Sequence, residues 1–132
     1  RARALKAMMA AAKEVAAKDR QVVIFPEGTR QLPDADAVIK PGAFAMYRDL
    51  EVKCVPIAVN TGLVWKSFWR KPGHVIFEVL KPIEPGLDKE AFTIRLKEAL
   101  DPATTRLVAE GRAAQGRHAD APVPAPFVRP EG

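Results

Sequence analysis

A short apolar run at residues 22–25 constrains the fold of this chain more than any other feature. It reads Val-Val-Ile-Phe without a polar residue, and Pro26 follows at once. A continuous β-branched and aromatic run is typical of a strand buried on both faces, in a sheet that helices cover. Because proline cannot donate a ladder hydrogen bond, the strand should end at Phe25. The sequence therefore predicts an α/β fold.

Helical and strand patterns alternate along the rest of the chain. Apolar residues recur every three or four positions in 4–18, and "KPGAFAMYRDL" predicts a short helix that begins near Pro41 and ends by Leu50. Two further apolar segments, "KCVPIAVN" and "HVIFEVL", are interpreted as buried strands, and the proline of the first requires an edge position or a bulge. Strands separated by helices favour a mixed, partly parallel sheet flanked by helices.

A last helix is expected after Asp88, which is a suitable N-cap residue. Its apolar stripe contains Phe92, Leu96 and Leu100, and Pro102 should interrupt or kink it. With 132 residues, of which 48% are hydrophobic, the chain is expected to hold one domain. We place that domain at 1–110. Residues 111–132 are rich in proline and alanine and should form a flexible tail, because they cannot bury enough surface to offset the entropy of ordering.

The composition indicates which kinds of molecule this protein can bind. Lysine and arginine number 21 against 16 acidic residues, and the net charge of +5 suits an anionic partner. The basic face of the first helix carries no aromatic residues for base stacking, so we interpret it as a solvated surface and expect no nucleic acid. Two distant histidines and the single Cys54 have no metal-ligand spacing, so no metal is expected. Cys54 should be a small buried hydrophobe.

The hydropathy of the chain and its first residues indicate whether it contains a transmembrane segment or a signal peptide. No apolar run reaches the roughly 20 residues that span a bilayer, so we expect no transmembrane segment. No signal peptide opens the chain. It starts "RARALKAMM", without an initiator methionine or an N-cap residue, and we therefore expect a further segment upstream.

Four residues with binding chemistry, Glu-Gly-Thr-Arg at 27–30, follow the predicted end of the strand, where α/β sheets commonly bind ligands. Gly28 allows a positive φ and close approach of a ligand to the backbone. The Arg30 guanidinium can hold a phosphate with two hydrogen bonds, and Glu27 and Thr29 can bond to an alcohol. This set suits a polyol phosphate. The alternative is an ion pair between Glu27 and Arg30 that only closes a turn.

The string "FPEGTR" at 25–30, with "KPG" and "VPIAVNTG" after it, resembles the C-terminal half of the glycerolipid acyltransferases, most of all the lysophosphatidic acid acyltransferases. The resemblance implies transfer of a fatty acyl group from a thioester carrier to 1-acylglycerol 3-phosphate, in phospholipid biosynthesis. It implies that the phosphate-bearing acceptor is held by Glu27, Gly28, Thr29 and Arg30. Lys40 would add charge there, unless it is simply an exposed lysine, and Pro56 and Ile57 would lie near the acyl chain.

The first motif of that family, Asn-His with Asp after four residues, is absent from this chain. The residues five positions after His74 and His118 are Val79 and Val123, so neither histidine begins it. The base that would take the proton of the acceptor is therefore missing. We expect the C-terminal, acceptor-binding part of a longer acyltransferase, inactive alone, with acyl carrier protein or coenzyme A as the acyl carrier and no other cofactor. The alternative is a noncatalytic module that binds phosphate or anionic lipid.

The segment "LVWKSFWRKPG" at 63–73 alternates aromatic and basic residues. Indole rings favour the membrane interface, and each basic residue near an anionic surface contributes about 1 kcal/mol. We expect Trp65, Phe68, Trp69 and Arg70 to rest on the cytoplasmic face of a membrane, with ordinary packing of the aromatic rings as the alternative. The sequence leaves the oligomeric state open.

Overall fold

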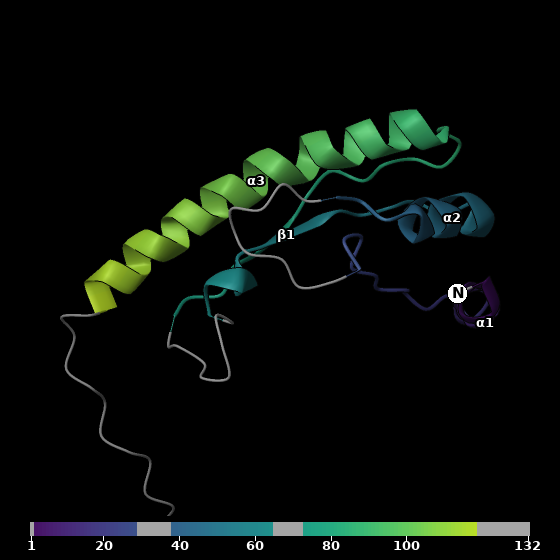
Figure 1. The fold of residues 1–132 in the computed structure, drawn as a ribbon, viewed down its shortest axis with the longest axis horizontal. Helices are drawn as coiled ribbons and strands as arrows, with labels where there is room; N and C mark the ends of the chain where they lie inside the picture. Colours follow the sequence, from purple (N-terminus) through teal and green to yellow (C-terminus); the bar gives the residue numbers. More distant parts are fainter. Residues whose placement is uncertain (1, 29–37, 65–72, 119–132) are drawn as a thin grey trace, which may run out of the picture.

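The computed structural model describes residues 2–28, 38–64 and 73–118, and its fold is mixed α/β (Figure 1). In chain order the elements are the helices α1 (Ala2–Ala16) and α2 (Pro41–Leu50), the strand β1 (Ile57–Val59), the 3₁₀ turn η1 (Thr61–Leu63), the strand β2 (Phe77–Val79) and the helix α3 (Lys89–His118). The long α3 lies along the small sheet, and α1 packs against α2. No helix in these ranges is both long and apolar enough to cross a membrane.

The two strands pair antiparallel, with Ala58 opposite Glu78. The expectation of a partly parallel sheet is therefore wrong for the described residues, since the chain reverses direction between β1 and β2 instead of crossing over the sheet. Cys54 and Ile83 form a further antiparallel bridge, and between the two pairings the second strand carries one residue more than the first. This is a bulge, and Pro56 lies beside it, as a proline in a strand requires.

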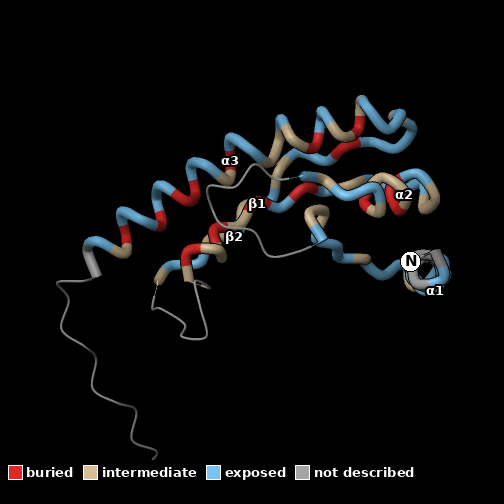
Figure 2. Tube along the Cα trace, in the orientation of Figure 1, coloured by how far each residue is buried: buried red, intermediate tan, exposed pale blue. Residues whose placement is uncertain are grey.

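Only one face of the sheet is covered within the described chain. Buried residues of α3 lie on the side that faces the strands (Figure 2), where Ala103 and Leu107 pack against Ala58. On the opposite face Phe77 is 66% and Val79 69% exposed. The side chains of β2 alternate between the two faces. The interpretation of this segment as a buried strand is wrong for the outer face, because within the described residues a single helix layer covers the sheet.

Residues 22–25, predicted to be a buried strand, are not a strand in the structure. Val23 is 77% and Phe25 80% exposed. The reason is physical: within the described ranges no second strand pairs with this segment, and a strand is stabilised by such a neighbour rather than by its own sequence.

A second cluster of buried side chains joins α2 to the start of α3. It comprises Tyr47, Ile83, Phe92 and Leu96. The rings of Tyr47 and Phe92 stack with centroids 4.2 Å apart. Cys54 packs against this cluster and is half-buried, as expected of a small apolar residue. Burial raises the pKa of its thiol, so the side chain stays neutral and unreactive.

Helix α3 is longer than the sequence indicated. Its start is confirmed, because the Ala91 N–H donates to Asp88 Oδ1 at 2.8 Å, as an N-cap does. The expected interruption at Pro102 is wrong, since the helix continues through it to His118. Residues 111–118 are therefore helical rather than irregular, and Gly111 and Ala114 are buried. Burial of small residues, which composition cannot reveal, holds this part in place. Residues 119–132 lie outside the described residues.

Asn60 ties the sheet to α3. Its side chain is buried, with 1% of its area exposed. Its Nδ2 donates to the carbonyl oxygens of His74 at 3.1 Å and Leu107 at 3.2 Å, and its Oδ1 accepts from the Ile76 N–H at 2.8 Å. One amide therefore joins the end of β1, the segment before β2 and the middle of α3. A buried amide is tolerated only when it is bonded in this way.

Gly111 lets α3 approach this amide closely. A Cβ at that position would lie 2.5 Å from Leu63 Cδ1 and 2.6 Å from Asn60 Nδ2, closer than real atoms allow. We predict that Gly111→Ala destabilises the fold by about 1 to 3 kcal/mol, because the helix would have to move away. Denaturant unfolding followed by circular dichroism measures this.

The matched control is Gly116→Ala in the same helix, where an added Cβ meets nothing within 4 Å. It should stabilise the helix by about 0.5 to 1 kcal/mol, since alanine is the better helix former. Equal effects of the two substitutions would contradict close packing at Gly111.

Candidate functional site

Residues 25–28 form a tight turn in the structure. The Gly28 N–H donates to the Phe25 carbonyl at 3.0 Å, which closes a four-residue turn with Pro26 at its second position. Gly28 has φ +64°, so the positive φ that the sequence allowed is the one adopted. A residue with a Cβ is strained in this conformation. The turn thus explains why glycine stands between Glu27 and the residues that follow.

Lys40 lies directly against this turn. Its backbone N–H donates to the Pro26 carbonyl at 2.7 Å. A Cβ on Gly28 would lie 3.3 Å from Lys40 Cγ, so the lysine stem runs beside the glycine. Lys40 is also the N-cap residue of α2, and its side chain makes no capping bond. The structure therefore joins the Glu27–Gly28 turn, a lysine and the positive end of a helix. Thr29 and Arg30 lie outside the described residues.

Glu27 is half-buried, and its surroundings disfavour a negative charge. Burial, and secondarily the negative charge of Asp101, raise the pKa of its carboxyl above the ordinary value of 4.5. Asp101 lies on α3 and pairs with Lys97 at 3.7 Å. The sequence reasoning did not identify Asp101 as a neighbour of Glu27, and no local pattern could have done so, because only the packing of α3 brings it there.

The two residues expected near an acyl chain point in opposite directions. Pro56 is buried, whereas Ile57 is 47% exposed on the uncovered face of the sheet. Successive residues of a strand alternate between its faces, so this separation follows from their spacing. Of the two, Ile57 is the one that a ligand can reach from outside.

The remaining expectations concern histidines, metals and the aromatic loop. His74 is exposed, and its carbonyl oxygen is bound by Asn60. Among the residues that the structure describes, no group of three or more His, Cys, Asp or Glu side chains could hold a metal ion. The residues Trp65, Phe68, Trp69 and Arg70 lie outside the described ranges.

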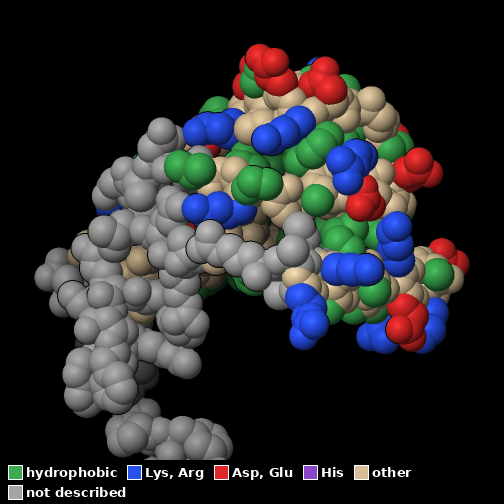
Figure 3. All heavy atoms as spheres, turned by 45° about the vertical axis from the view of Figure 1, so that its right-hand side comes forward, with side chains coloured by type: hydrophobic (Ala, Val, Ile, Leu, Met, Phe, Trp, Pro, Cys, Tyr) green, Lys and Arg blue, Asp and Glu red, His purple; other side chains and the backbone are tan. Residues whose placement is uncertain are grey.

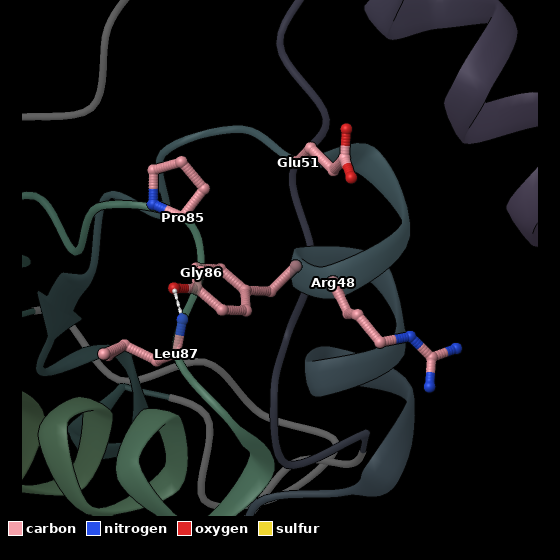
Figure 4. Close-up of a pocket in the computed structure, with 6 residues that line it drawn as sticks. Arg48, Glu51, Pro85, Gly86 and Leu87 are labelled. Carbon is pink, nitrogen blue, oxygen red and sulfur yellow. Dashed lines mark hydrogen bonds between the residues drawn. The ribbon is translucent and has the colours of Figure 1, made fainter.

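A shallow hollow of about 450 Å³ lies between α2 and residues 85–87. One of its polar side chains is already engaged: the Tyr47 hydroxyl accepts from the Leu87 N–H at 3.1 Å (Figure 4) and donates to the Glu84 carbonyl. Arg48 points away from Leu87 in that view and pairs with Asp49 at 2.7 Å. The hollow does not include Glu27 or Lys40 and offers little to a charged ligand.

The charge of the described surface is mixed but largely basic on one side. In Figure 3, Lys and Arg side chains spread over the middle and lower part of the described surface, with hydrophobic side chains between them. Such a surface attracts anions over a distance of about 8 Å at physiological salt. This agrees with the net charge of +5.

The conformation of Gly28 gives a stability prediction. Gly28→Ala should destabilise the protein by about 1 to 2 kcal/mol, because alanine disfavours a φ of +64°. Gly42→Ala in α2 is the control, since its added Cβ would make only an ordinary contact, 4.0 Å from Met8 Cε. Thermal unfolding of both variants tests this, and a Gly28→Ala protein as stable as the parent would contradict the strained turn.

The neighbourhood of Glu27 gives a pH prediction. The folded protein binds the Glu27 proton more tightly than the unfolded chain does. Protonated Glu27 therefore adds to the free energy of unfolding below pH 4.5, and this contribution is lost as the pH rises through the raised pKa. Asp101→Asn should lower the Glu27 pKa without restoring the ordinary value, since burial remains. NMR titration of the Glu27 side-chain carboxyl carbon measures the shift.

Glu98→Gln, which removes another acidic side chain of α3, serves as the control and should leave the Glu27 titration unchanged. If both substitutions moved the Glu27 pKa equally, the effect would be one of total charge and not of Asp101 in particular.

The first 60 residues of the chain match the family model described as Acyltransferase. The matched part holds the Glu27–Gly28 turn, Lys40 and β1, and it ends at Asn60. No curated protein and no solved structure matches the chain. The part of the chain that forms the candidate site is thus the part that is similar to acyltransferases.

Proposed function

We propose that this chain is the acceptor-binding part of an acyltransferase of phospholipid biosynthesis, whose acceptor is 1-acylglycerol 3-phosphate. The observation that carries the proposal is the tight turn at Glu27–Gly28 with Lys40 against it, in the part of the chain that matches the acyltransferase model. A turn without a side chain at Gly28, next to a lysine and a helix N-terminus, is suited to a phosphate-bearing molecule.

Each residue has a distinct role in this proposal. Gly28 gives the acceptor access to the backbone, and Lys40 and Arg30 bind its phosphate, Arg30 through two parallel hydrogen bonds. Thr29 contributes a hydroxyl. Glu27 accepts a hydrogen bond from a glycerol hydroxyl, because a half-buried carboxylate gains from a donor that replaces lost water.

The chemistry itself needs a group that this chain does not supply. The acceptor hydroxyl oxygen attacks the carbonyl carbon of the acyl thioester, its proton passes to a base, and the thiolate of the carrier leaves. Neither His74 nor His118 has the partner spacing of the family motif. We therefore propose that the base belongs to a further segment of a longer protein, and that no cofactor takes part besides the acyl carrier, acyl carrier protein or coenzyme A.

The proposal also assigns residues that contact the acyl chain and the membrane surface. Ile57, on the uncovered sheet face, is the residue of the "VPIAVNTG" string that an acyl chain can contact, while Pro56 supports the strand from the buried side. We place the protein at the cytoplasmic face of the membrane, with Trp65, Phe68, Trp69 and Arg70 at the lipid surface, because aromatic and basic side chains alternate there.

A second candidate is a noncatalytic module that binds phosphate or anionic lipid. The absence of the His-x4-Asp motif from the chain favours it, and it uses the same turn, Lys40 and Arg30. The two candidates differ in one respect: joined to a segment with that motif, an acceptor-binding part should transfer acyl groups from a thioester, whereas a module should not.

The proposed role of Arg30 leads to a binding prediction. The chain should bind glycerol 3-phosphate or a short-chain lysophosphatidic acid weakly, as followed by NMR chemical shifts of Gly28 and Lys40. Arg30→Ala should weaken this binding by about 10- to 100-fold, because two hydrogen bonds to a charged group are lost. Arg30→Lys should recover only part of it, since an ammonium keeps the charge but not the planar fork.

The control is Arg48→Ala, which removes a guanidinium that pairs with Asp49 and points away from Leu87. It should leave the affinity for the phosphate unchanged. Equal losses with Arg30→Ala and Arg48→Ala would mean that phosphate follows the net charge, and the turn would then not be the acceptor site.

A further inference from the structure

Residues 22–25 form an exposed apolar segment that shows neither turn nor bend and belongs to no helix or strand. Each of its side chains is β-branched or aromatic, and none is polar. Val23 is 77% and Phe25 80% exposed, whereas Ile24 between them is 37% exposed. Such alternation is typical of an extended backbone, in which successive side chains point to opposite sides. The segment therefore resembles a strand that lacks a neighbouring strand.

Both ends of this segment are fixed by turns. Before it, the Arg20 N–H donates to the Val15 carbonyl at 3.2 Å, which closes the C-terminus of α1. After it, the Gly28 N–H donates to the Phe25 carbonyl at 3.0 Å. An extended segment that is already held at both ends loses little conformational entropy when another strand pairs with it.

The two edges of the segment differ in their free backbone groups. In a strand the N–H and C=O of one residue point to the same edge, and those of the next residue point to the other edge. Val22 and Ile24 share one edge, and within the described ranges their N–H and C=O groups have no hydrogen bond. On the other edge, the Phe25 carbonyl is already bound by Gly28. The Val22–Ile24 edge is therefore the more complete acceptor for a further strand.

The chemistry of this edge favours a polypeptide as the partner. Backbone donors and acceptors lie beside apolar side chains, and the hydrocarbon of a bilayer cannot satisfy such donors and acceptors. A second strand satisfies them, and β-branched side chains that face each other across two strands stabilise the pair.

Charge adds a further requirement on the partner. Arg20, just before the segment, is exposed and forms no ion pair within the described chain. The whole chain carries a net charge of +5. An extended polypeptide with apolar residues in its middle and acidic residues at its ends is therefore complementary to this edge in both hydrogen bonding and charge.

We propose that the Val22–Ile24 edge accepts a β-strand from a separate polypeptide whose paired residues are apolar and flanked by acidic ones. The added strand exchanges N–H···O=C bonds with Val22 and Ile24, and one of its acidic residues lies near Arg20. Because the segment has only four residues, a short peptide binds to it weakly. This inference goes beyond the proposed function and does not depend on acyl transfer.

The test uses the whole chain and two synthetic peptides, acetyl-ETVIVTE-amide and acetyl-KTVIVTK-amide, which differ only in the charge of their ends. NMR follows the backbone amide shifts and the amide exchange rates. The acidic peptide should shift the signals of residues 22–25 in a saturable way. At saturation it should slow exchange at Ile24 by at least about threefold and leave Val23, whose N–H points to the other edge, unchanged. It should bind about two- to fivefold more tightly than the basic peptide, because an ion pair with Arg20 replaces a repulsion.

Two proline variants test which edge is used. Ile24→Pro removes a donor from the accepting edge and should abolish binding of the acidic peptide. Val23→Pro is the matched control, because it removes a donor from the opposite edge and should bind the peptide nearly as the parent does. Circular dichroism checks that both variants fold. The exchange rates of the parent decide the question if either variant does not.

Several results would overturn the proposal. The acidic peptide could leave residues 22–25 unshifted at every concentration, or shift the strands β1 and β2 instead. Equal slowing of exchange at Val23 and Ile24, or equal binding by the two proline variants, would indicate nonspecific association. Shifts at residues 22–25 that follow the concentration of the chain without peptide would assign the edge to a second copy. Shifts with phosphatidylglycerol vesicles but not with the peptide would assign the segment to lipid.

Discussion

The amide of Asn60 is the interaction on which the described fold depends. It stands where β1 ends, and it bonds at once to the carbonyl before β2, to the N–H of Ile76 and to a carbonyl in the middle of α3. A two-stranded sheet of three-residue strands is not stable by itself in water. The amide network and the close approach at Gly111 hold the sheet against a long helix, and the helix in turn carries Asp101 to the neighbourhood of Glu27.

The candidate site combines local conformation with long-range packing. The turn at Gly28 is local: a proline, a glycine with positive φ and one hydrogen bond fix it. The contact between the turn and Lys40 joins residues more than ten positions apart in the sequence. The raised pKa of Glu27 also depends on the packing of α3, which carries Asp101. The chemistry therefore depends on three segments that are well separated in the sequence.

The uncovered sheet face and the exposed segment 22–25 have a common cause. A sheet with apolar side chains on both faces is stabilised by an apolar layer on each of them, and the described residues supply one layer and one pair of strands. Apolar side chains such as Phe25, Phe77 and Val79 therefore remain in contact with water, at a cost of about 25 cal/mol per Å² relative to burial. This cost favours association with further polypeptide.

The sequence by itself determined the features that depend on neighbouring residues. It placed α2 between Pro41 and Leu50, the N-cap at Asp88, the stripe of Phe92 and Leu96, and the glycine at the turn, because capping, periodicity and backbone freedom act within a few residues. The tertiary structure decided that the sheet is antiparallel, that one face is bare, that α3 continues through Pro102 to His118, and that Asp101 lies near Glu27. Those outcomes depend on which segments pack together, and the free energy of packing belongs to contacts between residues far apart in the chain.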